Sequence, residues 1–253
     1  MSAAWSAFAD ELKRWRDEGR TVDFWWRDDD ATVETPPLRR LAGLAGSGSV
    51  PLALAVIPSE AKPEIAGLLG GMVTVIQHGG DHRNRAAADA KKNEFPEAEP
   101  IAAAEERIAG GRARLAAMFG GRFRPVLAPP WNRMAAAIVP RLAASGIDGL
   151  SRFGARASLR AAPGVEQVNT HVDIVDWRGG KGFAGEEAVL GAAVRHLAAK
   201  RAGAADATEP TGWLTHHAVH DEAGWRFLER LIEMTRAQPG LRWREVSELF
   251  HAG

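Results

Sequence analysis

The stretch VDFWWRDDDATVE, residues 22–34, follows an apolar segment with three consecutive carboxylates, Asp28, Asp29 and Asp30. The apolar and aromatic residues predict a strand over residues 22–27. Adjacent carboxylates repel one another, and this cost rises when they are partly buried. Either the run is a solvated acidic turn or a cation binds there, and the rest of the chain decides between the two.

Further along the chain, segments typical of strands alternate with segments typical of helices. The continuous apolar run VPLALAVI (50–57) is typical of a strand buried on both faces. More strands are predicted near residues 72–77, 124–129 and 212–217, with helices between them, one of them from about residue 133 to 144, and an amphipathic helix over residues 3–18 precedes them all. The polar residues 83–99 are predicted to form a long loop, in which Lys91, Lys92 and Glu94 either cover the substrate or, as we expect, are solvated. This alternation predicts an α/β domain with a parallel sheet, either open or closed into a barrel.

Composition narrows the function classes. The 253 residues suit one domain, and equal numbers of acidic and basic residues give no electrostatic reason to expect nucleic acid or an anionic membrane as partner. Without cysteine, any metal must use oxygen and imidazole ligands. No apolar run approaches the roughly 18 residues of a membrane span, and no signal peptide is evident, so we expect a cytoplasmic protein.

Reactive residues in parallel α/β folds collect at the carboxyl ends of strands. Five unusual clusters follow or overlap predicted strands: residues 28–30, 78–82, 128–133, 173–177 and 216–217. His78 and His82 are four residues apart, so both imidazoles would share one face of a helical turn. Two histidines and an aspartate from a neighbouring strand would form a metal site with open positions for water and substrate.

Taken in order, the clusters resemble the five motifs of the NodB-type polysaccharide deacetylases, carbohydrate esterase family 4. The matching segments are Asp28–Asp29, His78–His82, Pro129–Trp131, Asp173–Trp177 and Leu214–His216. The resemblance implies an α/β fold with a single domain over residues 1–253. An N-terminal helix (1–20) would precede a distorted (β/α) barrel of about seven parallel strands (22–251).

The resemblance also implies a divalent ion, which we expect to be Zn²⁺, with the ligands Asp29, His78 and His82. Asp28 would act as the general base and His216 as the general acid, with Asp176 orienting His216. The chain departs from the family where Asp30 replaces a glycine. The register could therefore shift by one residue, which would make Asp29 the base and Asp30 the ligand.

Two further departures concern residues near the base and the metal. The family often has an arginine before the third-motif proline to hold the base, and this chain has Ala128 there. Arg27, Arg133 or Asn132 are the candidates to replace it. Gly79 stands where the family has serine or threonine. His217 is the alternative to His216 if the last strand ends early, since neighbouring strand residues face opposite sides.

Tryptophans lie beside most of these motifs, and flat indole faces suit sugar rings. We expect the substrate to contact residues drawn from the motifs: Trp26, Pro130, Trp131, Asn132, Arg133 and Trp177. Trp25 and Trp213 also adjoin motifs, whereas Trp5, Trp15 and Trp225 are expected to pack in the core.

The predicted activity is therefore removal of an acetyl group from an N-acetylated or O-acetylated sugar or polysaccharide precursor, free or nucleotide- or lipid-linked. A catalytically inactive carbohydrate-binding protein on the same fold is the alternative, supported by Ala128. A phosphoester hydrolase is the third possibility. It would need a second metal, for which the acidic run could supply ligands. The scarcity of clustered Lys and Arg residues around the motifs argues against a phosphate-rich substrate, although Arg27 and Arg133 keep this possibility open.

Overall fold

The computed structural model describes residues 2–251, and within them ten strands form one sheet. The strand order is β6-β7-β5-β4-β3-β2-β1-β9-β8, and β10 pairs with β1. The strands are β1 (Val22–Ala31), β2 (Leu52–Val56), β3 (Val73–His78), β4 (Phe123–Ala128), β5 (Gly149–Leu150), β6 (Arg160–Ala162), β7 (Val165–Gln167), β8 (Val172–Asp173), β9 (Thr211–Thr215) and β10 (Leu241–Trp243).

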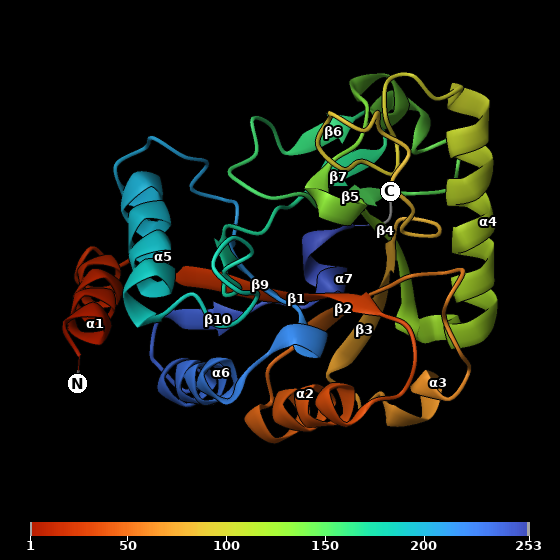
Figure 1. Cartoon of the computed structure of the whole chain (residues 1–253). Coiled ribbons are helices and arrows are strands. Elements are labelled where there is room, and N and C mark those ends of the chain that lie inside the picture. Colours follow the sequence, from red (N-terminus) through yellow and green to blue (C-terminus); the bar gives the residue numbers. More distant parts are fainter. Residues whose placement is uncertain (1, 252–253) are drawn as a thin grey trace.

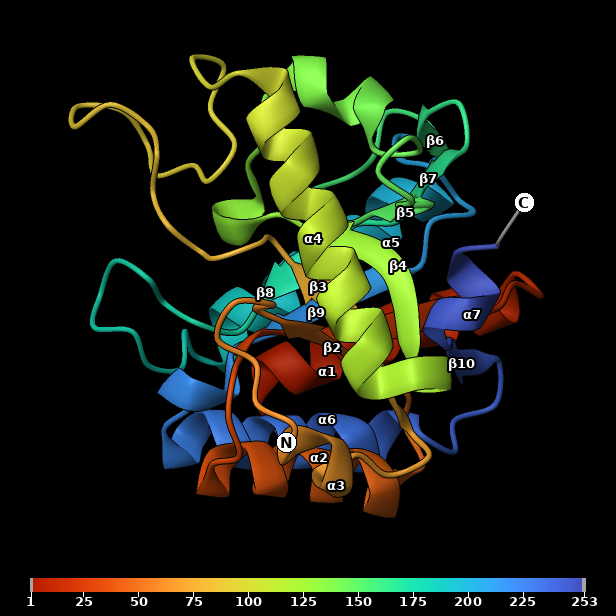
Figure 2. The same cartoon turned by 90° about the vertical axis from the view of Figure 1, so that its right-hand side faces the viewer.

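Helices cover this sheet on several sides (Figure 1). Helices α1 and α5 lie side by side at one end, α2 and α6 pack together along one face, and α4 runs along another side (Figure 2). The helices are α1 (Ala3–Asp17), α2 (Pro36–Gly48), α3 (Ile65–Leu68), α4 (Ile101–Phe119), α5 (Glu186–Arg201), α6 (Glu222–Thr235) and α7 (Val246–Leu249). Among residues 2–251, no helix has the length and apolar character needed to cross a membrane.

Every strand pairing in the described residues is parallel except that of β6 with β7. An isolated parallel bridge between Phe153 and Thr170 links the segments that follow β5 and precede β8. The predicted α/β fold with a distorted barrel is confirmed, although its sheet is not closed. Short strands after β4 raise the strand number above the predicted seven.

The aromatic residues form much of the core beneath the sheet. Phe8 of α1 stacks on Phe24 of β1 with centroids 6.2 Å apart, and Trp213 of β9 meets Phe24 edge-on at 5.6 Å. Trp5 and Trp15 are buried as predicted, and so is Trp225. Such pairs stabilise the fold by about 0.5–1.5 kcal/mol each beyond their burial.

Two predicted elements differ from those observed. The helix expected from about residue 133 to 144 is a 3₁₀ segment, η3 (Ala136–Arg141), since Pro140 lacks the amide hydrogen that an α-helix needs. The strand predicted over residues 22–27 continues to Ala31 and carries the three aspartates. Its pairing with β2 shifts between Asp28 and Ala31, and Asp30 has a positive φ of 70°.

This irregularity decides which carboxylates face the same side. In a regular strand, neighbouring side chains alternate between the two faces of the sheet. The break at the end of β1 suspends that alternation, so Asp29 and Asp30 both line a cavity while Asp28 does not.

Candidate active site

A cavity of about 860 Å³ lies where β1, β3, β4, β8 and β9 end. Its wall contains residues from all five sequence clusters, which confirms that they converge in space. The lining residues are Asp29, Asp30, His78, His82, Lys92, Trp131, Asn132, Arg133, Phe153, Asp173, Trp177, Arg178, Lys181 and His216.

Three of these residues form a group able to hold a metal ion. One ligand atom each of Asp30, His78 and His82 lies within 4.8 Å of the other two. Asp30 Oδ1 is 3.0 Å from His78 Nε2 and 3.2 Å from His82 Nε2, yet this buried oxygen accepts no hydrogen bond of suitable angle. The three atoms therefore lie close enough together to bind one shared ion.

The orientation of His78 supports the same conclusion. Its Nδ1 lies 3.0 Å from the carbonyl oxygen of Ala128, which suits an Nδ1–H donor and leaves Nε2 with a free lone pair. Burial lowers the pKa of His78, but the negative charges of Asp29 and Asp30 outweigh burial and raise it above its ordinary value. Burial raises the pKa of Asp30, but the contacts with His78 and His82 outweigh it and hold that pKa well below its usual range.

Asp29 is held by a fully buried arginine. Arg27 Nε lies 2.8 Å from Asp29 Oδ1, and Arg27 Nη2 donates to Oδ2 at 2.9 Å. Arg27 also donates to the Ser151 hydroxyl at 2.7 Å and to Asn132 Oδ1 at 2.7 Å. Of the three candidates to replace the missing arginine at Ala128, Arg27 contacts the carboxylate and Asn132 supports Arg27.

Asp28 lies on the other side of the strand, in the core. Its carboxylate accepts hydrogen bonds from the Thr215 hydroxyl at 2.6 Å and the His217 amide at 3.0 Å, and lies 2.5 Å from His217 Nδ1. Burial raises the pKa of Asp28, but the charge of His217 and its hydrogen bond outweigh burial and lower it. Asp28 and His217 therefore form a buried pair outside the cavity, and the geometry favours the alternative register, with Asp29 and Asp30 in place of Asp28 and Asp29.

His216 lines the cavity, as the sequence predicted. Its Nε2 lies 4.0 Å from Asp29 Oδ2, and its ring meets Trp177 edge-on with centroids 4.6 Å apart. Asp173 accepts a hydrogen bond from Trp177 Nε1 at 2.8 Å, and while burial raises the pKa of Asp173, the nearby charge of His216 opposes that rise. Asp173 is thus the carboxylate beside His216. Asp176 lies outside the cavity wall and accepts bonds from the amides of residues 178–179.

The predicted substrate contacts divide into two groups. Trp131, Asn132, Arg133 and Trp177 line the cavity. Trp26 and Pro130 are buried and do not: the indole of Trp26 donates to the Thr215 hydroxyl at 2.8 Å. Trp25 and Trp213 are also buried, because inward-facing positions of a central strand pack against the core.

One residue of the site was missed by sequence reasoning, which placed Glu94 in a solvated loop. Glu94 is fully buried, and its carboxylate accepts hydrogen bonds from the amides of Gly80 (2.8 Å), Asp81 (3.1 Å) and His82 (3.1 Å). Arg107 of α4 donates to the same carboxylate at 3.1 Å. Glu94 therefore fixes the segment that carries His82, whose φ is +56°.

The same carboxylate explains Gly79. Gly79 has a φ of +60°, and a Cβ there would lie 2.1 Å from Glu94 Oε2 and 2.6 Å from Pro130 Cδ. A serine or threonine would collide with both, so the position of Glu94 requires glycine where the family has serine or threonine.

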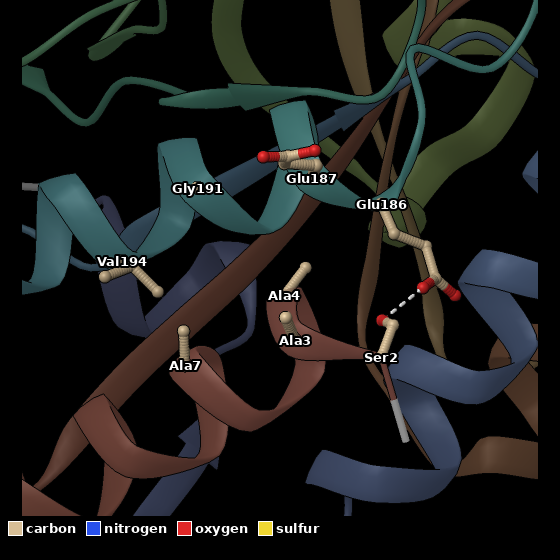
Figure 3. A pocket seen from close by; sticks show the side chains of 8 residues that line it. All are labelled: Ser2, Ala3, Ala4, Ala7, Glu186, Glu187, Gly191 and Val194. Atoms are coloured by element: carbon tan, nitrogen blue, oxygen red, sulfur yellow. Dashed lines mark hydrogen bonds between the residues drawn. The ribbon is translucent and has the colours of Figure 1, made fainter.

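Two other places in the described residues bring together features of a site. A cavity of about 490 Å³ between α1 and α5 is lined mainly by small residues, with Glu186 bonded to Ser2 (Figure 3). His171, His196 and Glu209 also bring three ligand atoms together, but the two imidazoles stack at 3.6 Å with planes only 16° apart. His171 accepts a hydrogen bond from the Gly212 amide at Nδ1 (3.0 Å), so its Nε2 carries a proton towards Glu209 (3.2 Å) and not a free lone pair.

Comparisons with known proteins bear on the fold. No protein-family model matches this sequence, and no curated protein is significantly similar to it. Among solved structures, a Mycobacterium smegmatis protein assigned to the polysaccharide deacetylases has a TM-score of 0.61 at 17% identity, over 91% of this chain and 89% of that one.

Two further structures agree. A family 4 carbohydrate esterase from Streptomyces lividans, in complex with acetate, has a TM-score of 0.54 at 14% identity over 88% of this chain and 90% of that one. The peptidoglycan deacetylase PdaC from Bacillus subtilis has a TM-score of 0.54 at 14% identity over 91% and 90%. The resemblance to the deacetylases is thereby confirmed at the level of the fold.

Proposed function

We propose that this chain is a metal-dependent hydrolase that removes an acetyl group from an acetylated sugar. The observation that carries the proposal is the pairing of Asp29 with Arg27 directly beside the convergent ligand atoms of Asp30, His78 and His82. A base held in place next to a metal site is what hydrolysis of an amide or ester by water requires.

Zn²⁺ is the ion we propose, because two imidazoles and one carboxylate are a common zinc set that leaves positions open. Asp30, His78 and His82 would hold it. When bound, the ion would polarise the acetyl carbonyl and lower the pKa of an adjacent water.

The proton transfers fall to the chain's own residues. A carboxylate oxygen of Asp29 takes the proton of the attacking water, and Arg27 keeps that carboxylate oriented. His216 Nε2, on the same cavity wall, gives a proton to the departing amine or alcohol. Asp173 stands in the role expected of Asp176, as the carboxylate on the cavity wall beside His216.

The cavity also suits a carbohydrate. Trp131 and Trp177 line it and offer indole faces on which the apolar faces of a sugar ring can pack. Trp131 lies against His82 with centroids 4.6 Å apart, and Trp177 lies against His216 at 4.6 Å. A sugar between the two would therefore have its acetyl group close to both the base and the acid. An O-acetyl group would use the same residues.

The two alternatives are weaker. The binding-protein alternative rested on Ala128, and Arg27 supplies the guanidinium that Ala128 does not. The phosphoester alternative needs ligands for a second metal, and Asp28 is bonded to His217 and Thr215 outside the cavity.

The proposal is tested by measuring bound metal and acetate release from N-acetylated chito-oligosaccharides. We expect about one zinc ion per wild-type chain, loss of both metal and activity in His82→Ala, and retained metal with about 10²–10⁴-fold lower kcat in Asp29→Asn. His251→Ala, at an exposed histidine outside the cavity, is the control. Metal binding without acetate release from any acetylated sugar would favour the binding protein instead.

A further inference from the structure

Four cationic side chains line the cavity of the candidate site: Lys92, Arg133, Arg178 and Lys181. We call them the cation rim. All four are exposed, and within residues 2–251 none forms an ion pair with a carboxylate. Elsewhere exposed arginines are commonly paired, as Arg40 is with two glutamates.

The rim comes from segments that are far apart in the sequence. Lys92 belongs to the loop between β3 and α4, and Arg133 follows the 3₁₀ segment η2 (Pro130–Asn132). Arg178 and Lys181 belong to the loop between β8 and α5. Figure 2 shows these two long loops projecting from the same side of the sheet. The sequence prediction that few cations surround the motifs is therefore wrong, because the fold brings them together.

One half of the rim is held in place by local contacts. The guanidinium of Arg133 donates to the carbonyl of Lys92 at 3.1 Å. The ammonium of Lys92 lies 5.9 Å from the ring centre of Trp131, within the range of a cation–π contact. Both charges are thus beside the indole that would pack on the sugar.

The carboxylates of the cavity do not neutralise the rim. Asp29 is paired with Arg27, and Asp30 faces the two imidazoles. Asp173 is hydrogen bonded to Trp177 and to the amide of Val175. The entrance therefore carries an excess of positive charge on a chain whose net charge is zero.

We propose that the acetylated substrate is anionic, with a phosphoryl or carboxylate group that the cation rim binds while the acetyl group lies at the candidate site. This proposal rests on the proposed deacetylase function. Arginine binds both kinds of oxyanion through two parallel hydrogen bonds, and lysine adds a mobile charge. An anionic sugar would place its charge at the loops and its acetamide at the metal group.

The first experiment compares acetylated sugars that differ in charge. Acetate release and calorimetric binding are measured for neutral di-N-acetylchitobiose, N-acetylglucosamine 1-phosphate, UDP-N-acetylglucosamine and N-acetylmuramic acid. We expect the anionic sugars to bind at least 10-fold more tightly than the neutral one, and added salt to reduce that preference. The phosphate and muramic acid arms distinguish a phosphoryl group from a carboxylate.

The second experiment uses rim variants. Arg178→Gln/Lys181→Gln should weaken binding of the preferred anionic sugar about 10-fold or more and leave the neutral sugar unchanged. Lys92→Gln should do the same to a smaller extent, whereas Lys91→Gln, at the adjacent exposed lysine outside the cavity, should have no effect. Binding is measured on chelator-treated protein as well, because phosphate also binds metals directly.

The outcomes separate this proposal from the function on which it rests. Acetate release without any preference for charge would overturn the anionic substrate and leave the deacetylase standing. Charge-dependent binding that the rim variants remove, without acetate release, would support the rim and contradict the deacetylase. Equal binding of charged and neutral sugars by wild type and variants would also overturn the rim.

Discussion

The substitution Glu94→Gln tests how His82 of the proposed metal group is positioned, because Glu94 belongs neither to that group nor to the cavity wall. In Glu94→Gln, one carboxylate oxygen becomes an NH₂ group that donates hydrogen bonds and accepts none. At Oε2 that group would face the His82 amide, and at Oε1 it would face the amides of Gly80 and Asp81 as well as Arg107. Either orientation sets donor against donor at the segment that carries His82.

The expected magnitudes differ for folding and for metal binding. Burial raises the pKa of Glu94, although hydrogen bonds from backbone amides oppose that rise. The buried carboxylate therefore has a desolvation cost that a neutral glutamine does not have. We therefore expect the free energy of unfolding to fall by only about 1–2 kcal/mol. Zinc affinity should fall about 10- to 100-fold, the range found when a residue supporting a ligand is replaced.

The assay is a zinc titration against a competing chelator, with urea unfolding on the same samples. Glu99→Gln is the matched control: Glu99 also binds Arg107, at 2.7 and 2.8 Å, but within the described residues its carboxylate accepts no backbone amide near His82. Unchanged zinc affinity in folded Glu94→Gln, or an equal loss in Glu99→Gln, would refute the positioning role.

Three other outcomes follow from the geometry. Arg27→Lys should lower kcat about 100-fold with metal content unchanged, because one ammonium cannot contact Asp29, Ser151 and Asn132 together; unchanged kcat would contradict this. Trp177→Ala should raise KM several-fold for any sugar, measured by acetate release. Burial lowers the pKa of His196 to about 2 in the folded protein, whereas the pKa in the unfolded chain is 6.5. The contribution of neutral His196 to stability is therefore complete above pH 6.5 and decreases below it, so the free energy of unfolding should fall by about 2 kcal/mol from pH 7 to pH 5. Urea unfolding at both values should show that loss in wild type and less of it in His196→Gln.

The strand ends show most clearly which features of the fold and the site could be predicted from the sequence. The alternation of apolar strands and helices predicted the α/β fold, and the clusters after each strand predicted the residues that meet in the cavity. These two predictions do not require knowledge of individual side-chain contacts, because parallel strands bring their carboxyl ends to one edge of the sheet. Arg27 was one of three candidates, and only the packing of β1 against the segments at Ser151 and Asn132 distinguishes it.

The rest depended on features that periodicity does not encode. Glu94 and the cation rim lie in irregular loops, where spacing predicts no side-chain direction. Asp176 was predicted in place of Asp173, whereas β8 ends at Asp173 and the turn that follows leaves Asp176 outside the cavity wall. The three aspartates form the hardest case, because alternation along β1 fails within that run.

The two registers of that run predict opposite results for Asp28→Asn and Asp30→Asn. In the observed geometry, Asp28→Asn leaves the buried His217 without its counter-charge and should cost about 3–5 kcal/mol of stability while zinc binding persists in the folded protein. Asp30→Asn should abolish zinc binding, because it removes the carboxylate of the three-residue group. Zinc measurements at low temperature, with the folded fraction followed by circular dichroism, separate the two effects. Loss of zinc from folded Asp28→Asn, with zinc retained by Asp30→Asn, would restore the register in which Asp28 and Asp29 do the chemistry.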